Sequence, residues 1–195
     1  MPNSPTHSPL GDSPGDPLSG PFDAEAIYAH LLDQIRAGLA PQALQQLVLI
    51  GIHSGGVWLA ERLHRDLGLA GRIGTLDISF YRDDFGRIGL HPQVKPSDIP
   101  VDVAGASIML VDDILYTGRT IRGAMNVLFD YGRPARIDLA VLIDRGGREL
   151  PVEARWAGAR FNLPSDRSFV LTREPADGAA AQSRFALTIE PQFRS

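Results

Sequence analysis

The sequence predicts an α/β fold: a central, mainly parallel sheet flanked by helices, with a small C-terminal strand region. Continuous apolar runs occur at residues 47–52 and 107–113 and within residues 136–147. Such runs are typical of strands that are covered on both faces, as in parallel sheets. Between them lie segments whose apolar residues recur every three or four positions, which is the spacing of an amphipathic helix.

The helices are predicted from spacing and capping. Residues 22–39 indicate a helix with Asp23 as its N-cap. A second helix follows the glycine-rich turn after residue 52, and a third begins near residue 120. The apolar positions that predict these two helices are Val57, Ala60, Leu63 and Leu67, and Ile121, Ala124, Met125 and Leu128.

Four further segments complete the predicted fold. Residues 71–81 resemble a strand, whereas residues 82–100 mix Gly, Pro, His, Lys and Asp without any period. A connection of that length is usually a functional lid or a disordered segment. Residues 168–174 and 184–190 indicate two short strands around a flexible linker.

The chain divides into a tail and one domain. Pro, Ser, Gly and Asp dominate residues 1–21, so this segment offers little apolar surface to bury, and we expect a disordered extension. The alternative for this extension is a docking segment. Residues 22–195 form the predicted folded domain.

Composition excludes several classes of function. The 195 residues include no cysteine, which excludes disulfides, thiolate nucleophiles and cysteine-ligated metals. A net charge of −4 argues against a general binder of nucleic acid or anionic membranes, although a local basic face is compatible with it. The sequence also has no apolar run long enough for a membrane span and no secretory signal, so the expected compartment is the cytoplasm.

Chemistry is concentrated in the segment VDDILYTGRT, residues 111–120. An apolar strand runs into Asp112 and Asp113, and a turn with Thr117 and Gly118 then opens a helix. Carboxylates at the end of a strand can accept hydrogen bonds from ribose hydroxyls and hold Mg²⁺, while the N–H groups at a helix start bind phosphate. A bare pair of aspartates could simply end a strand. The full pattern instead favours a phosphorylated sugar as ligand.

This segment resembles the phosphoribosyl pyrophosphate (PRPP) motif of the type I phosphoribosyltransferases. The chain is further similar to the PyrR family, whose members regulate pyrimidine operons and act as uracil phosphoribosyltransferases. The likeness covers roughly residues 23–173, and the segments that carry it are DISFYRDD, DIPVDV, VDDILYTGRT, GRP at 132–134 and LAVLIDRGGRELPVEA.

The resemblance implies roles for the residues of this motif. Asp112 and Asp113 are expected to hold the ribose hydroxyls and, through water or ribose, Mg²⁺ as the cofactor. The residues expected to cradle or border the 5′-phosphate are Tyr116, Thr117, Gly118, Arg119 and Thr120.

Other segments receive roles by the same resemblance. The turn His53, Ser54, Gly55 and Gly56 is expected to be the pyrophosphate loop, although many relatives carry Lys and Arg where this chain has His53 and Gly55. The alternative is a plain strand-to-helix turn.

The lid and the base site are also implied by the resemblance. Arg82, at the base of the predicted lid, is expected to be a catalytic residue, as are Asp112 and Asp113. Arg145 and Arg148 are expected near the base. The alternatives are a surface loop at residues 82–100 and a turn with solvated arginines at residues 145–148.

Three functions follow from these expectations. The first is a uracil phosphoribosyltransferase that converts uracil and PRPP to UMP and pyrophosphate. The second is a UMP-sensing regulator that binds the pyrimidine mRNA leader, and the third is a phosphoribosyltransferase for another base. The resemblance also implies a homo-oligomer. RNA is the less favoured partner because the helix at residues 22–39 carries only Arg36 as a fixed cation, and Gly147 and Ala159 replace basic or histidine residues of the family.

Overall fold

The computed structural model describes residues 22–78, 97–175 and 183–192. Arg82 and most of the predicted lid, together with the N-terminal 21 residues, lie outside these ranges. No helix in the described ranges is long and apolar enough to cross a membrane.

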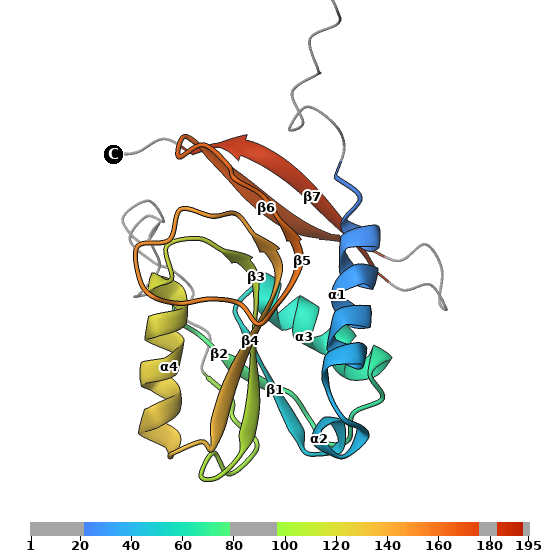
Figure 1. The fold of residues 1–195 in the computed structure, drawn as a ribbon, viewed down its shortest axis with the longest axis vertical. Helices are drawn as coiled ribbons and strands as arrows, with labels where there is room; N and C mark the ends of the chain where they lie inside the picture. The colour runs from blue at the N-terminus through green and yellow to red at the C-terminus, as the bar shows by residue number, and fades with distance from the viewer. Residues whose placement is uncertain (1–21, 79–96, 176–182, 193–195) are drawn as a thin grey trace, which may run out of the picture.

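A five-stranded parallel sheet forms the centre of the molecule (Figure 1). Its strands lie in the order β2-β1-β3-β4-β5, and each one pairs in parallel with its neighbours. The strands are β1 (Leu47–Ile52), β2 (Gly74–Leu76), β3 (Ser107–Leu115), β4 (Arg136–Asp144) and β5 (Trp156–Arg160). The predicted α/β class and parallel sheet are confirmed.

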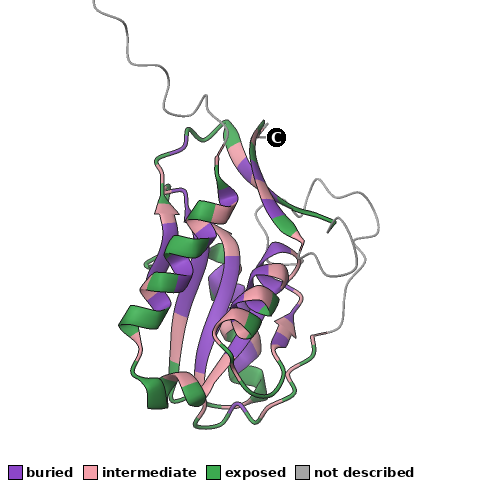
Figure 2. Ribbon diagram, turned by 90° about the vertical axis from the view of Figure 1, so that its right-hand side faces the viewer, coloured by how far each residue is buried: buried purple, intermediate pink, exposed green. Residues whose placement is uncertain are grey.

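Helices cover both faces of this sheet. On one face, α1 (Ala24–Gly38) and α3 (Gly55–Asp66) enclose a core that includes Leu49, Met109 and Leu142. On the other face, α4 (Arg119–Tyr131) covers Ile50 and Leu110 among others. Successive strand residues thus enter opposite cores, as the two-residue period of a strand requires. Figure 2 shows the buried residues concentrated on the strands and the exposed ones on the outer sides of the helices.

The C-terminal strands form a separate antiparallel hairpin. Strands β6 (Arg167–Glu174) and β7 (Arg184–Pro191) pair along their whole length, as predicted for the C-terminal region. The hairpin lies beyond the carboxyl ends of the sheet strands, at the top of Figure 1. Its Phe169 and Leu187 join the core beneath α1 and α3.

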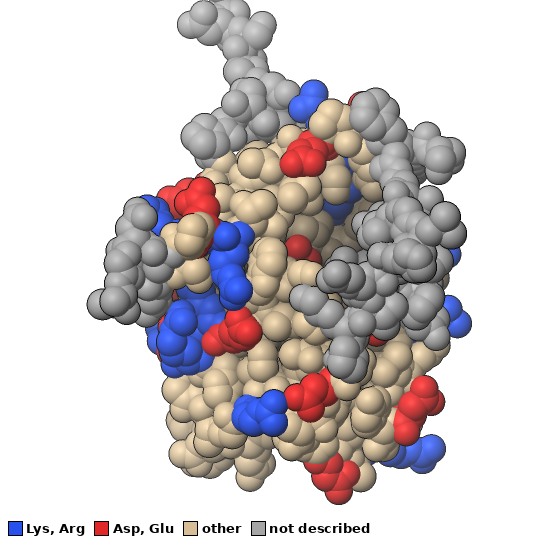
Figure 3. All heavy atoms as spheres, turned by 180° about the vertical axis from the view of Figure 1, so that it is seen from behind, with Lys and Arg blue, Asp and Glu red and all other residues tan. Residues whose placement is uncertain are grey.

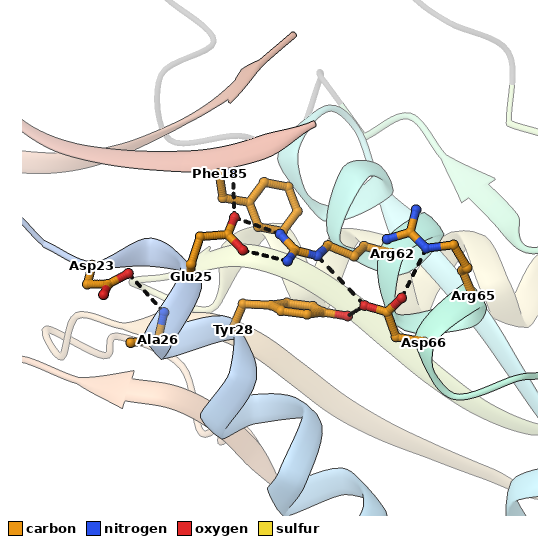
Figure 4. A network of polar contacts seen from close by, with 8 residues as sticks. All are labelled: Asp23, Glu25, Ala26, Tyr28, Arg62, Arg65, Asp66 and Phe185. Carbon is orange, nitrogen blue, oxygen red and sulfur yellow. Dashed lines mark hydrogen bonds and ion pairs between the residues drawn. The ribbon is translucent and has the colours of Figure 1, made fainter. Parts of the chain in front are cut away.

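A polar network ties this hairpin to α1 and α3 (Figure 4). Arg62 donates two hydrogen bonds to Glu25, and Glu25 accepts a third from the backbone N–H of Phe185. These hydrogen bonds, with that of Arg62 first, lower the pKa of Glu25 against the opposing effect of burial. The Arg62 guanidinium carbon also lies 4.0 Å from the centre of the Tyr28 ring. The hairpin is therefore anchored by charge as well as by apolar contact.

Four elements differ from the prediction, and one of them is β2: within the described part of the strand predicted at residues 71–81, only Gly74–Leu76 is a strand. The short helix α2 (Pro41–Gln45) and the strand β5 were not predicted. Strand β3 also continues past both aspartates to Leu115, because its pairing with β4 extends to Leu115 and Asp144. Asp112 and Asp113 therefore lie inside β3, near its carboxyl end.

Candidate active site

Two strand-to-helix turns meet at the carboxyl end of the sheet. Strand β1 ends at Ile52 and α3 begins at Gly55, while the adjacent strand β3 ends at Leu115 and α4 begins at Arg119. Ligands of open parallel sheets bind at this edge. The turn at residues 53–56 and the motif at residues 111–120 thus lie side by side.

The first turn approaches the aspartates closely. A Cβ atom at Gly55 would lie 2.5 Å from the carboxyl carbon of Asp113, and one at Gly56 would lie 2.9 Å from the Cα atom of Asp112. At Gly56 the close atoms belong to the backbone, so no side chain fits there, whereas at Gly55 they all belong to the side chain of Asp113. The His53–Ser54 peptide bond in this turn is cis. An arginine at position 55, as many relatives carry, would require the Asp113 side chain to move.

The aspartates themselves differ in exposure. Asp112 is 3% exposed, and its Oδ1 accepts a hydrogen bond from the backbone N–H of Asp113 at 3.0 Å. Asp113 is partly exposed and faces the Gly55 turn. The structure thus leaves the Asp113 carboxylate as the more accessible of the two.

The second turn has the conformation expected for an anion site at a helix start. Gly118 is the N-cap of α4 with φ of 93°, in the left-handed region that favours glycine. Thr117 is buried, and its Oγ1 accepts a hydrogen bond from the N–H of Arg119. Arg119 pairs with Glu149 across 2.6 Å at the rim of the turn. Thr120 lies in the first turn of α4.

The loop after β4 packs against the same turn. The backbone N–H groups of Glu149 and Leu150 both donate to the carbonyl of Thr117. Arg148 donates to the carbonyl of Tyr116 and, at 2.5 Å, to Asp144. The segment predicted to lie near the base therefore contacts the turn at residues 116–118 directly.

Arg145 is placed differently from the expectation of a base contact. Its side chain is 1% exposed and lies under the loop, with the guanidinium carbon 3.8 Å from the centre of the Tyr116 ring. The structure brings Arg145 to the site but not to its surface. Nothing in the sequence distinguishes this buried arginine from Arg148, three residues later, which is partly exposed.

Similarity to known proteins identifies the family. The phosphoribosyl transferase domain model matches residues 23–166. A protein named "Bifunctional protein PyrR" from Ralstonia nicotianae is 47% identical over 88% of this chain and 96% of its own length. Its namesake from Nitrosococcus oceani is 48% identical over 77% of this chain and 86% of its own length. The chain belongs to the PyrR family of phosphoribosyltransferases.

Solved structures support the type I phosphoribosyltransferase fold of this PyrR-family chain. A hypoxanthine-guanine phosphoribosyltransferase from Bacillus anthracis aligns with a TM-score of 0.58 over 74% of this chain and 85% of its own, at 19% identity. A hypoxanthine phosphoribosyltransferase from Staphylococcus aureus gives the same TM-score over 78% and 82%, at 20% identity. At this identity the likeness concerns the fold alone.

Asp112 and Asp113 in this site suit a Mg²⁺ ion that is also held by a bound substrate. Asp112 and Asp113 offer carboxylate oxygens, the ligand type that Mg²⁺ prefers. Within the described ranges, no group of three or more His, Asp or Glu side chains could hold a metal ion. Mg²⁺ commonly binds through one or two carboxylates, water and substrate phosphates, and these two aspartates fit that mode.

Proposed function

We propose that this protein transfers the phosphoribosyl group of PRPP to uracil, giving UMP and pyrophosphate. The observation that carries the proposal is the meeting of the Gly55 turn with Asp113, since it joins the two subsites that PRPP requires. Uracil as the base comes from the resemblance to the PyrR family, to which the relatives named above belong.

Each group has a place in the proposed reaction. Asp112 and Asp113 accept hydrogen bonds from the ribose hydroxyls, and the amides at the start of α4 bind the 5′-phosphate. The amides of residues 53–56 bind the pyrophosphate. The bond from C1′ to pyrophosphate breaks as a uracil nitrogen forms its bond to C1′ from the opposite face, and the proton of that nitrogen passes to pyrophosphate or water. Bound Mg²⁺ would supply positive charge to the leaving pyrophosphate.

A panel of bases tests the proposal. The enzyme is incubated with PRPP, Mg²⁺ and one of uracil, orotate or hypoxanthine, and pyrophosphate release is measured. We expect turnover with uracil alone. Turnover with hypoxanthine or orotate in its place would assign the protein to another base, and no turnover with any base would contradict the proposal.

A variant pair tests the role of Asp113. Asp113→Asn should lower turnover on the order of a hundredfold, the scale for removing one key polar contact in a transition state. Asp130→Asn, an exposed position on α4, is the matched control and should keep wild-type activity. Equal activity of the two variants would remove Asp113 from the proposed role.

The relatives are named bifunctional, which supports a second candidate function: UMP-sensing regulation by binding a pyrimidine mRNA leader. Acidic and basic groups are intermingled on the face seen in Figure 3. Arg148, a residue shared with the family, donates to Tyr116 and Asp144.

Binding to a leader transcript tests this second function. Affinity in the low micromolar range that weakens with salt would support it, because phosphate contacts release counterions. Absence of such affinity at moderate salt would overturn it without affecting the transferase.

A further inference from the structure

Arg145 is a buried charge that the proposed reaction does not use. Its Nη1 donates to the side-chain oxygen of Gln192 at 3.0 Å, and its Nη2 donates to the carbonyl of Pro164 at 3.1 Å. The Nε atom is buried and has no hydrogen-bond partner among the described residues. Burial lowers the pKa of Arg145, and the nearby Tyr116 opposes this effect. An arginine nevertheless stays charged in proteins, so its desolvation carries a cost that some other gain must offset.

Tyr116 is the residue against which this charge is placed. The guanidinium carbon of Arg145 lies over the Tyr116 ring, 3.8 Å from its centre. The backbone of Gly147 also closes on the ring, since a Cβ atom there would lie 2.5 Å from Tyr116 Cε2. Arg148 in turn holds the Tyr116 carbonyl. Tyr116 is thus fixed through both its ring and its backbone.

Tyr116 links the two halves of the PRPP motif. It stands between Asp113 on β3 and Thr117 in the phosphate turn. A shift of Tyr116 therefore moves the phosphate turn relative to the ribose acids. Displacement of about 1 Å in a substrate-positioning element is enough to weaken activity strongly.

The other end of the arginine contacts the C-terminal hairpin. Gln192 directly follows β7, and its backbone N–H donates to the carbonyl of Asp166 before β6. Both β6 and Gln192 lie beyond residues 23–166, the part that the phosphoribosyl transferase domain model matches. A segment outside the common domain thus reaches the motif through one buried side chain.

We propose that Arg145 is a positioning residue, and that the C-terminal hairpin holds it through Gln192 so that Tyr116 keeps the phosphate turn in its PRPP-binding conformation. This inference rests on the proposed function. It reassigns Arg145 from a contact with the base to a link between the hairpin and the PRPP motif.

Variants at Gln192 test the link with little risk to folding, because this residue is only half buried at the end of the hairpin. Gln192→Ala removes the acceptor for Arg145 and should raise the KM for PRPP by about tenfold while kcat changes by less than about twofold. Gln192→Glu keeps an acceptor oxygen and should restore the wild-type KM. Gln42→Ala, exposed on α2, is the matched control and should leave both constants unchanged.

Arg145→Lys provides a second measurement. Lysine keeps the charge but lacks the planar fork that serves Gln192 and Pro164 together, so we expect a KM increase at least as large as that of Gln192→Ala. The PRPP-induced rise in Tm should weaken in parallel in both variants.

Three outcomes would decide the matter. A lower Tm with an unchanged KM for PRPP would show that the contact only stabilises the fold and would overturn the inference. An unchanged KM in both variants, in an otherwise active enzyme, would do the same. A wild-type protein that neither binds PRPP nor turns over any base would refute the proposed function, and this inference with it.

Discussion

No methyl group can be added to Gly55 without displacing the carboxylate of Asp113, because the new Cβ atom would lie 2.5 Å from the Asp113 carboxyl carbon. The closest approach is to a side chain, but that side chain is the proposed ribose ligand. Any relief of the clash therefore moves a functional group.

Gly55→Ala is expected to lower kcat/KM for PRPP by about tenfold, because the Asp113 side chain must turn away from the new methyl group into a less favourable rotamer. Gly71→Ala is the control: that glycine has φ of 78° and nothing within 4 Å of its would-be Cβ atom. It should cost about 1–2 kcal/mol of stability but leave steady-state kinetics unchanged. Wild-type kinetics in Gly55→Ala would show that the position of the Asp113 side chain against Gly55 does not matter for the reaction.

Glu149 places a negative charge beside the turn that we propose binds the 5′-phosphate. It pairs with Arg119 at 2.6 Å, and both side chains are about half exposed, at 45% and 54%. A pair this exposed contributes little to folding. Glu149→Gln should therefore change stability by less than about 0.5 kcal/mol. The KM for PRPP should fall by about two- to fivefold, because the anionic substrate no longer meets this carboxylate.

Steady-state kinetics and chemical denaturation measure both effects. Glu174→Gln, exposed at the end of β6, changes the net charge equally and should leave the KM as it is. A KM that rises in Glu149→Gln would mean that the carboxylate aligns Arg119 for phosphate binding, and the repulsion argument would fail.

Much of the fold follows from local sequence. Continuous apolar runs predict β1, β3 and β4, and Asp23 is the N-cap of α1, accepting from the N–H of Ala26 at 3.0 Å. Strand β5 escapes prediction because WAGAR is short and rich in small residues. Its Gly158 suits close packing on α1, where a Cβ atom would lie 2.7 Å from the carbonyl of Ile27, and only the folded chain reveals that need.

The features of the candidate site likewise divide into those that local sequence predicts and those that it does not. The sequence pattern at residues 111–120 predicts the strand, the turn and the helix start because all three depend on neighbouring residues. The contact between Gly55 and Asp113 joins residues far apart in the chain. The burial of Arg145 likewise depends on Gln192, 47 residues later. Such relations arise from tertiary packing and leave no local signal.

Removal of magnesium separates a metal site shared with substrate from one preformed in the protein. The described residues offer Asp112 and Asp113 but no cluster of three metal-binding side chains. Chelation by EDTA should therefore leave the Tm of the ligand-free protein within about 1 °C of its value, while abolishing the rise in Tm caused by PRPP. Mg²⁺ alone raising the Tm by several degrees would indicate a preformed site instead.

The hydrogen bond from Tyr28 to Asp66 makes stability depend on alkaline pH. The Tyr28 hydroxyl donates to Asp66 Oδ2 at 2.6 Å, and the tyrosine is 3% exposed. Burial first, and then this hydrogen bond, raise the pKa of Tyr28 far above its ordinary value of about 10. Above that pH the unfolded chain loses the proton and the folded chain keeps it. The free energy of unfolding should then fall as pH rises, by about 1.4 kcal/mol per pH unit for this group.

Tyr28→Phe tests this assignment by urea denaturation at pH 7 and across pH 9.5–11. At pH 7 the variant should lose about 1.5–3 kcal/mol, the contribution of a hydrogen bond to a charged acceptor. Its alkaline slope should be shallower than that of the wild type by the contribution of one proton, because phenylalanine has none to release. Tyr131→Phe, at a tyrosine that is 50% exposed on α4, should lose less than about 0.5 kcal/mol at pH 7. Parallel alkaline slopes in Tyr28→Phe and the wild type would show that Tyr28 does not keep its proton in the folded state.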